Sequence, residues 1–366
     1  MRRLPALLAL ATLTGSLLVP GSASAAVPAD TRVSAATAVG THNTYERGTY
    51  TYLAQALDAR PGLIELDVWP DVLARQWRVS HSNPLGNDNN CVAATSPAQL
   101  YTGTRNKNLE HCLDDLRLWL GAHPDAGPVI LKLELKTGFS SRTGQGPAQL
   151  DALLAARLGD RVFRPADLLG GHADLDAAAR ADAWPTRAQL AGRVIVELIP
   201  GTVEEGNPTD TLWTDVEYAR YLAGLAAAGT LSRAQAFPAV HRAQAGDPRS
   251  RYADTTLRPW FVLFDGDATA YVTGGIDTAW YDTNHYLLVM TDAQNVPPAV
   301  GTDPDAARAR LAQLAAAHAS VASADWAALP AVVGEVAPAA DPRRDVRSGW
   351  AAAGPGGRHW RRPPPP

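Results

Sequence analysis

The chain has 366 residues, of which 46% are hydrophobic and 19% are charged, a composition typical of a folded globular protein and not of a disordered one. The length suits one large α/β domain or two small ones. The formal net charge of −4 at pH 7 argues against a nucleic-acid partner, which needs a basic surface. We expect no nucleic-acid partner and a monomer.

The first 25 residues have the pattern of a secretory signal peptide. Arg2 and Arg3 open the segment, an apolar run follows over 4–20, and the small residues 23–25 form a cleavage signal. A membrane anchor is the alternative, but threonine, glycine and serine interrupt the apolar run, which falls short of the roughly 20 strongly apolar residues that span a bilayer. We therefore expect a secreted, extracellular protein.

Short β-rich apolar runs alternate with stretches that have helical spacing or the character of loops. Eight such runs occur, the number of strands in a closed β/α barrel. The predicted strands are residues 36–40, 63–69, 77–80, 129–135, 193–199, 260–264, 286–290 and 320–324. The predicted helices are residues 50–59, 109–122, 147–158, 187–190, 214–228 and 303–317.

An open, doubly wound sheet would show the same alternation, and the polar residues within the strands decide between the two folds. Glu65 and Asp67 share one face of the second run, and Lys132, Glu134 and Lys136 share one face of the fourth. A strand buried in an open parallel sheet would be apolar on both faces. A polar face turned to a common centre therefore favours a TIM-type (β/α)8 barrel.

Two cysteines, Cys91 and Cys112, stand 21 positions apart. Disulfides persist outside the cytoplasm, so a bridge is the expected state, and it would contribute about 3 kcal/mol in the chain-entropy model. Two buried free thiols are the weaker alternative. A zinc site is weaker still, because no Cys-x-x-Cys pair is present.

The chain end differs from the rest. We expect the barrel domain to cover residues 26–336 and a disordered tail, rich in Pro, Gly and Arg, to cover residues 337–366. Trp350 and Trp360 in this basic tail could contact anionic lipid head groups, but a solvated tail without a role is the favoured interpretation.

Polar residues, five of them ionisable, stand at or near the ends of the first four predicted strands. The carboxyl ends of barrel strands meet at one mouth, where catalytic residues of such barrels lie. The members of this set are His42, Asn43, Glu65, Asp67, His81 and Glu134.

Three carboxylates in one mouth would repel one another unless a cation lies among them, so the set implies a metal. Carboxylate and amide oxygens in an irregular arrangement suit Ca²⁺ better than Mg²⁺, and zinc is disfavoured although His42 and His81 could bind it. We interpret the two histidines as acid/base or charge-stabilising groups.

The ordered motifs of this region resemble the catalytic half of the calcium-dependent bacterial phosphoinositide-specific phospholipase C family. They are GTHNTY at 40–45, IELDVW at 64–69, VSHS at 79–82 and LKLE at 131–134. Together they lie within residues 36–140. The later predicted strands resemble the family only in the spacing at which strands follow one another.

The resemblance implies cleavage of phosphatidylinositol, a membrane phospholipid reached by peripheral contact, to diacylglycerol and a cyclic inositol phosphate. His42 would stabilise the charged phosphorane and His81 would protonate the leaving glycerol oxygen. One of two carboxylates, Glu65 or Glu134, would accept the proton of the inositol 2-hydroxyl. The calcium ligands would be Asn43, Glu65, Asp67 and Glu134.

Four further aspartates follow the later predicted strands and could bind inositol hydroxyls, although ordinary loop capping is an equal alternative. They are Asp265, Asp267, Asp292 and Asp325. Lys132 and Lys136 could contact phosphate or neutralise Glu134.

Other functions remain open at this point. A glycerophosphodiester phosphodiesterase or a sphingomyelinase D-like enzyme would use similar residues on the same barrel, but the former has His-Arg-Gly where this chain has His42 followed by Asn43 and Thr44. A non-catalytic secreted lipid- or sugar-binding barrel is the alternative of another class, and the full set of histidines and carboxylates speaks against it.

Overall fold

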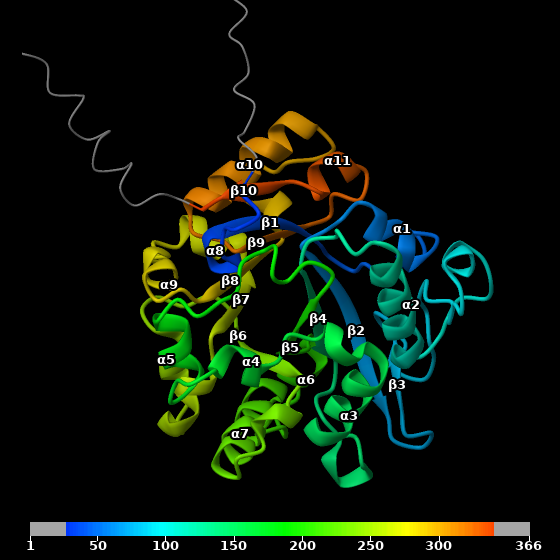
Figure 1. Ribbon diagram of the computed structural model, residues 1–366, viewed down its shortest axis with the longest axis horizontal. Helices are drawn as coiled ribbons and strands as arrows, with labels where there is room; N and C mark the ends of the chain where they lie inside the picture. The colour runs from blue at the N-terminus through cyan, green and yellow to red at the C-terminus, as the bar shows by residue number, and fades with distance from the viewer. Residues whose placement is uncertain (1–26, 340–366) are drawn as a thin grey trace, which may run out of the picture.

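Eight parallel strands pair side by side and close into a ring with helices around it in the computed structural model, which describes residues 27–339 (Figure 1). The order around the ring is β1, β2, β4, β5, β6, β7, β8 and β9, and β1 pairs with both β9 and β2. The TIM-type barrel is therefore confirmed. The strands of the ring are β1 (Ala36–Thr41), β2 (Leu63–Asp71), β4 (Val129–Leu135), β5 (Val194–Pro200), β6 (Ala236–His241), β7 (Leu263–Asp267), β8 (Leu287–Thr291) and β9 (Val321–Ala324).

The helices cover the outer face of this ring. They are α1 (Leu53–Asp58), α2 (Leu109–Ala122), α3 (Pro147–Leu158), α4 (Pro165–Leu169), α5 (Leu175–Arg180), α6 (Thr202–Glu205), α7 (Thr214–Ala227), α8 (Ala268–Thr273), α9 (Ala279–Thr283), α10 (Pro304–Ala316) and α11 (Pro330–Val333). Helices α2 and α3 have the predicted bounds. The predicted helix at 187–190 is wrong, because these residues form consecutive turns that end at Gly192, whose φ is 67°. None of the helices between residues 27 and 339 combines the length and the apolar character needed to cross a bilayer.

The third predicted strand exists, but it is not part of the ring. β3 (Gln76–Val79) pairs antiparallel with β2, so that Val68 faces Val79 and Asp71 faces Gln76. The reason is the short connection, since a parallel crossover needs about a dozen residues or more and only a tight turn joins these strands. Asp71 closes this turn by accepting hydrogen bonds from the backbone of Leu73 and Ala74.

β6, which completes the ring, was not among the predicted strands. Its segment, Ala-Phe-Pro-Ala-Val-His, carries Pro238 in the middle, and proline has no N–H to donate within a sheet. The strand nevertheless pairs with β5 and β7, and its residues from Ala236 to Val240 are buried. Tertiary burial here outweighs the local signal.

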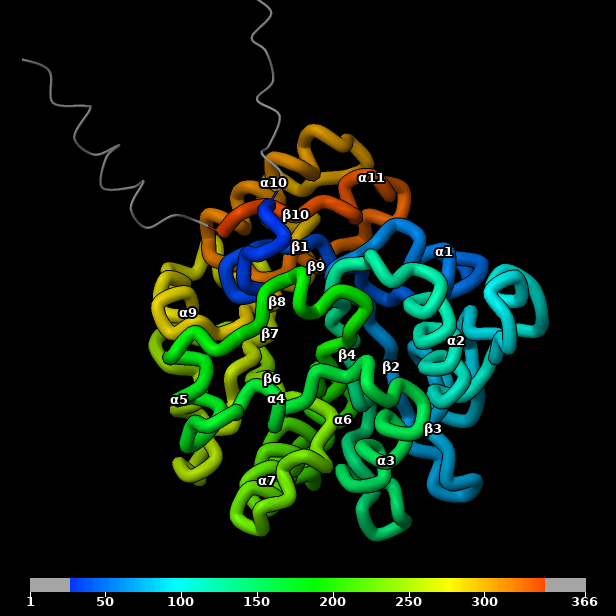
Figure 2. The backbone as a smooth tube through the Cα atoms, viewed as in Figure 1, coloured from blue at the N-terminus to red at the C-terminus, as the bar shows by residue number. Residues whose placement is uncertain are grey.

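The sheet also extends beyond the predicted end of the domain. β10 (Val336–Pro338) pairs antiparallel with β1, and Ala339 donates a backbone hydrogen bond to Ala35. Figure 2 shows this last segment beside the start of the chain at β1. The tail was predicted to begin at 337, so its first residues belong to the fold. The predicted signal peptide and the rest of the tail lie outside residues 27–339.

The expected disulfide joins Cys91 to Cys112 on α2. It fixes the loop that follows β3 to the barrel wall, and Asp115 of the same helix accepts hydrogen bonds from the backbone of Val92 and Ala94, both at 2.7 Å. This loop begins beside the mouth of the barrel, because Ser80 donates a backbone hydrogen bond to the Asp67 carbonyl.

Candidate active site

Three carboxylates meet at the carboxyl end of β2 and β4, which are neighbours in the ring. Glu65 and Asp67 project from the same face of β2, and Glu134 stands beside Asp67 on β4. One oxygen of each lies within 4.8 Å of the others, and Glu65 and Asp67 are almost fully buried. The predicted carboxylate cluster is therefore present.

Some of the buried oxygens in this cluster have no hydrogen-bond donor. Glu65 Oε2 and Asp67 Oδ1 are buried and accept no hydrogen bond from the residues that the structure describes. Burial, together with the charges of Glu134 and Glu65, raises the pKa of Asp67 to about 7, although Lys136 opposes the shift. Buried oxygens that repel one another and lack donors fit a hard cation, and oxygen ligands are those that Ca²⁺ prefers.

Asn43 lies in the turn after β1 with a φ of 47°, in the left-handed region that asparagine tolerates better than most residues. Its Oδ1 accepts a hydrogen bond of 3.2 Å from the hydroxyl of Tyr45, which is fully buried. Burial and then the charge of Asp67 raise the pKa of Tyr45 well above its ordinary value, so this hydroxyl remains a donor. Tyr45 therefore connects the predicted amide ligand with the carboxylate cluster.

Two lysines neutralise the carboxylates, which settles a choice that the sequence left open. Lys136 Nζ lies 2.9 Å from Asp67 Oδ2 and 2.7 Å from Glu134 Oε1. Lys132 Nζ lies 2.9 Å from Asp265 Oδ2 and 3.8 Å from Glu65 Oε1. Both ammonium groups are thus engaged by carboxylates inside the mouth.

His42 follows β1 and is held by a residue that follows β9. Its Nδ1 lies 3.0 Å from Asp325 Oδ1, and Gln294 fixes Asp325 by donating to Oδ2 at 2.9 Å and accepting from the Asp325 backbone N–H at 3.2 Å. Burial lowers the pKa of His42, but the hydrogen bond that its ring donates to Asp325 and the charge of Glu65 outweigh it and raise the pKa to about 9. His42 is therefore oriented and charged.

Asp325 is a functional candidate to which the sequence analysis gave another role. It was weighed only as a ligand for inositol hydroxyls or as a cap, because residues 283 positions apart give no sign of contact. Asp292 also lies near His42 and Asp325. One nitrogen or carboxylate oxygen of each of the three residues lies within 4.8 Å of the other two.

His81 stands on the loop after β3 and not at the end of a ring strand. It is exposed and lines a cavity of about 260 Å³ with Glu46, Arg47 and Asp88. A second cavity, of about 320 Å³, is lined by His42, Asn43 and Asp325, and Glu46 also borders it. The two histidines therefore face neighbouring hollows on either side of Glu46.

Two of the four aspartates after the later strands have structural roles, so their carboxylates are already engaged within the protein. Asp265 is completely buried between Lys132 and His241, whose Nδ1 lies 3.1 Å from its Oδ1. Asp267 caps α8 by accepting from the backbone of Ala270.

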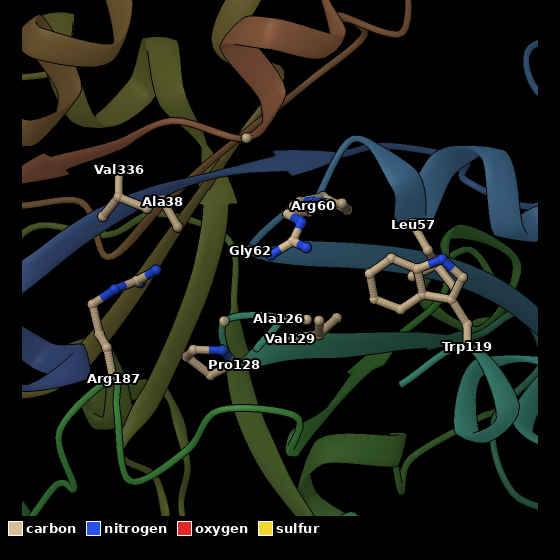
Figure 3. Close-up of a pocket in the computed structure, with 13 residues that line it drawn as sticks. Ala38, Leu57, Arg60, Gly62, Trp119, Ala126, Pro128, Val129, Arg187 and Val336 are labelled. Carbon is tan, nitrogen blue, oxygen red and sulfur yellow. The ribbon is translucent and has the colours of Figure 1, made fainter. Parts of the chain in front are cut away.

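A further cavity, of about 200 Å³, lies at the opposite end of the barrel, where Gly62 and Pro128 precede β2 and β4 (Figure 3). Arg60, Trp119 and Arg187 also line it. Among the described residues around it there is no carboxylate or histidine, so it lacks the groups for acid/base chemistry or calcium binding.

No family model matches the chain, and no curated protein matches it. Among solved structures, it is similar to a Ca²⁺-dependent phosphatidylinositol-specific phospholipase C from Streptomyces antibioticus, with 57% identity and a TM-score of 0.82, over 84% of this chain and 99% of that one. It is also similar in fold to a calcium-dependent phosphoinositol-specific phospholipase C from a Pseudomonas species, with 21% identity and a TM-score of 0.64, over 85% of this chain and 96% of that one.

Proposed function

The chain belongs to the calcium-dependent phosphatidylinositol-specific phospholipase C family, and we propose that it cleaves phosphatidylinositol to diacylglycerol and a cyclic inositol phosphate. The observation that carries the proposal is the cluster of Glu65, Asp67 and Glu134, in which buried oxygens of Glu65 and Asp67 lack donors, at the same mouth as His42, whose pKa is raised to about 9. The carboxylate cluster and His42 are explained by this activity, without the alternatives of a glycerophosphodiesterase or a non-catalytic barrel.

Glu65, Asp67, Glu134 and Asn43 would hold the calcium ion. When bound, the ion supplies positive charge that lowers the pKa of the inositol 2-hydroxyl and neutralises charge on the phosphate. Lys136 already pairs with two of these carboxylates, so their negative charge would be neutralised by its ammonium group together with the metal.

The reaction replaces one phosphorus–oxygen bond by another. Glu65 or Glu134 accepts the proton of the 2-hydroxyl, whose oxygen forms a bond to phosphorus, while the bond from phosphorus to the glycerol oxygen breaks. His42, held in its charged form by Asp325, stabilises the negative charge that develops on the phosphorane oxygens. His81 donates a proton to the departing glycerol oxygen.

Peripheral contact with a bilayer is supported by the large apolar side chains exposed at the mouth. Leu73, at the tip of the β2–β3 hairpin, is 94% exposed, and Leu85, on the loop after β3, is 85% exposed. Val203 on α6, which follows β5, is 47% exposed. All three lie at the carboxyl end of the ring, so a monomer could place its active site against the lipid surface.

Secretion is part of the same proposal. The signal-like segment at the start of the chain and the disulfide between Cys91 and Cys112 are both typical of exported proteins. Mass determination of the protein recovered from culture medium tests this, since the intact first 25 residues or two free thiols would contradict it.

The activity is tested by product analysis on phosphatidylinositol vesicles. The expected result is diacylglycerol with cyclic inositol phosphate, lost in a calcium chelator and restored by added calcium. Full turnover after exhaustive chelation would refute the metal assignment, and release of phosphatidic acid in place of diacylglycerol would refute the reaction. Asp267→Asn, at a capping residue of the rim, provides a control variant that keeps activity.

A further inference from the structure

The cavity of about 200 Å³ at the amino end of the ring holds a guanidinium that lacks a partner. Arg187, from the segment that precedes β5, lines this cavity and is half-buried, and its side chain makes no ion pair or hydrogen bond with the residues between 27 and 339. Burial lowers the pKa of Arg187, and no carboxylate offsets the shift. An unpaired charge that is partly removed from water costs free energy, which a bound anion would offset.

The surroundings of Arg187 keep this charge away from bulk water. A Cβ atom added to Gly127 would lie 3.1 Å from Arg187 Nη2, so the guanidinium lies close to the backbone just before β4. On another side, Arg187 borders a smaller hollow of about 30 Å³ with the buried side chains of Ile130 and Leu287. The guanidinium therefore lies between an apolar interior and the open cavity.

The charges around the cavity favour an anion with a single negative charge. Arg60 is the second cation of the lining, but its Nη1 lies 2.8 Å from Asp125 Oδ2, so this charge is already paired. Figure 3 shows the two arginine side chains on either side of the open part of the cavity. Arg187 thus leaves one positive charge to balance. A carboxylate matches it, and a phosphate group with nearly two negative charges exceeds it.

The opposite wall is apolar and suits the body of an organic ligand. Leu57, Trp119 and Val129 line the cavity and are buried. Trp119 Nε1 already donates to Asp58 Oδ1 at 2.8 Å, so the indole offers the cavity only its ring. The volume is somewhat larger than the roughly 150 Å³ that accommodates benzene in a protein interior. The cavity therefore has room for about one ring or a short branched chain.

From this arrangement we propose that the cavity binds a small organic carboxylate with an apolar body. The carboxylate accepts hydrogen bonds from the Arg187 guanidinium, and the body packs against Leu57 and Trp119. The lining comes from the segments before β2, β4 and β5 and from the start of β10, so a ligand here would connect both ends of the domain. It would stabilise the folded chain from the end opposite the catalytic mouth.

The test titrates benzoate into the full-length, calcium-free protein by calorimetry, with benzamide and inorganic phosphate as comparison probes. Benzoate should bind at one site. Benzamide has the same size without the charge and should bind at least about tenfold more weakly, the factor that one hydrogen bond to a charged group contributes. Inorganic phosphate should also bind more weakly than benzoate. At about ten times its Kd, benzoate should raise the melting temperature by about 2 °C.

Two variants locate the binding. Arg187→Met should weaken benzoate binding by at least about tenfold. Val336→Phe fills the cavity from β10 and leaves Arg187 in place, and it should weaken binding by a similar factor. Arg157→Met is the matched control, because the Arg157 guanidinium pairs with Asp114 outside the cavity, and it should bind benzoate as the wild type does.

The inference would be overturned by a wild-type protein that does not bind benzoate, or by benzamide or inorganic phosphate binding as tightly as benzoate. Unchanged benzoate affinity in Arg187→Met and Val336→Phe would also overturn it. Binding that is lost in His42→Ala and kept in Arg187→Met would place the anion at the mouth and contradict the proposal. If Arg187→Met does not fold, Val336→Phe and the comparison of benzoate with benzamide decide. None of these measurements uses turnover, so a negative result here would leave the proposed function intact.

Discussion

Replacing Lys136 by methionine tests whether its ammonium and calcium stabilise the same carboxylates. The Lys136 side chain is 6% exposed and contacts Asp67 and Glu134 at 2.9 and 2.7 Å. Removing one partner of a buried ion pair costs about 3–5 kcal/mol, and protonation of Asp67 offsets part of that cost. We expect the variant to be less stable by about 3 kcal/mol in chelator, which corresponds to a melting temperature lower by about 5 °C.

Calcium should restore most of this loss, because the ion supplies the missing positive charge and binds only the folded chain. The assay is thermal unfolding of both proteins in chelator and in excess calcium. Lys132→Met is the control, since Lys132 is equally buried but its closest partner, Asp265 at 2.9 Å, lies outside the predicted ligand set, and the one predicted ligand near it, Glu65, is 3.8 Å away. The control should lose stability in both conditions. An equal stabilisation by calcium in wild type, Lys136→Met and Lys132→Met would refute the reasoning.

Further outcomes follow from other contacts. His42→Ala and His81→Ala should each reduce kcat by at least about 10²-fold in folded protein, and near-normal rates would exclude the assigned roles. Asp325→Asn should lower kcat by at least about tenfold and shift the pH profile of His42 to lower pH, a change that a merely structural residue would not cause. Burial raises the pKa of Asp151 to about 7, so between about pH 4 and pH 7 the folded chain holds a proton on Asp151 that the unfolded chain has lost. The free energy of unfolding should therefore fall as the pH rises through this range. Unfolding curves of Asp151→Asn should lack this part of the pH dependence. Plain phosphatidylinositol should be cleaved with a higher kcat/KM than its 4,5-bisphosphate, because carboxylates already neutralise both lysines of the mouth, and an equal or higher value for the bisphosphate would contradict this.

The catalytic half of the barrel could be predicted because its signals are local. Glu65 and Asp67 share a face by strand alternation, and Glu134 follows the same rule on the neighbouring strand, so their meeting needs only the parallel pairing of two strands. The clustering of His42 with Asp325 could not be predicted in this way. It depends on the closure of the ring between β1 and β9, which brings together the two ends of the domain.

The other differences have equally specific causes. β6 was not predicted because it has a proline in its middle. The predicted number of eight strands was correct only because β3, which lies outside the ring, was counted in its stead. Glu197 of β5 is completely buried inside the ring beside Lys132, a position that the alternation of its strand alone does not reveal. Lysines and carboxylates alternate on these inner faces, and sequence cannot show which of them pair with each other and which meet a ligand.

The attachment of β3 to β2 alone has a consequence for how such a mouth can diversify. The ring of eight strands closes without β3, so residues can be added to or removed from the β2–β3 turn while strand number and stagger stay the same. The same ribbon carries the exposed Leu73 at its tip and leads into His81 at its base. Under the proposed function, changes in the length of this one surface turn would alter how deeply Leu73 enters a lipid layer and where the proposed proton donor His81 stands, while the carboxylates of Glu65, Asp67 and Glu134 remain fixed on the strands of the ring.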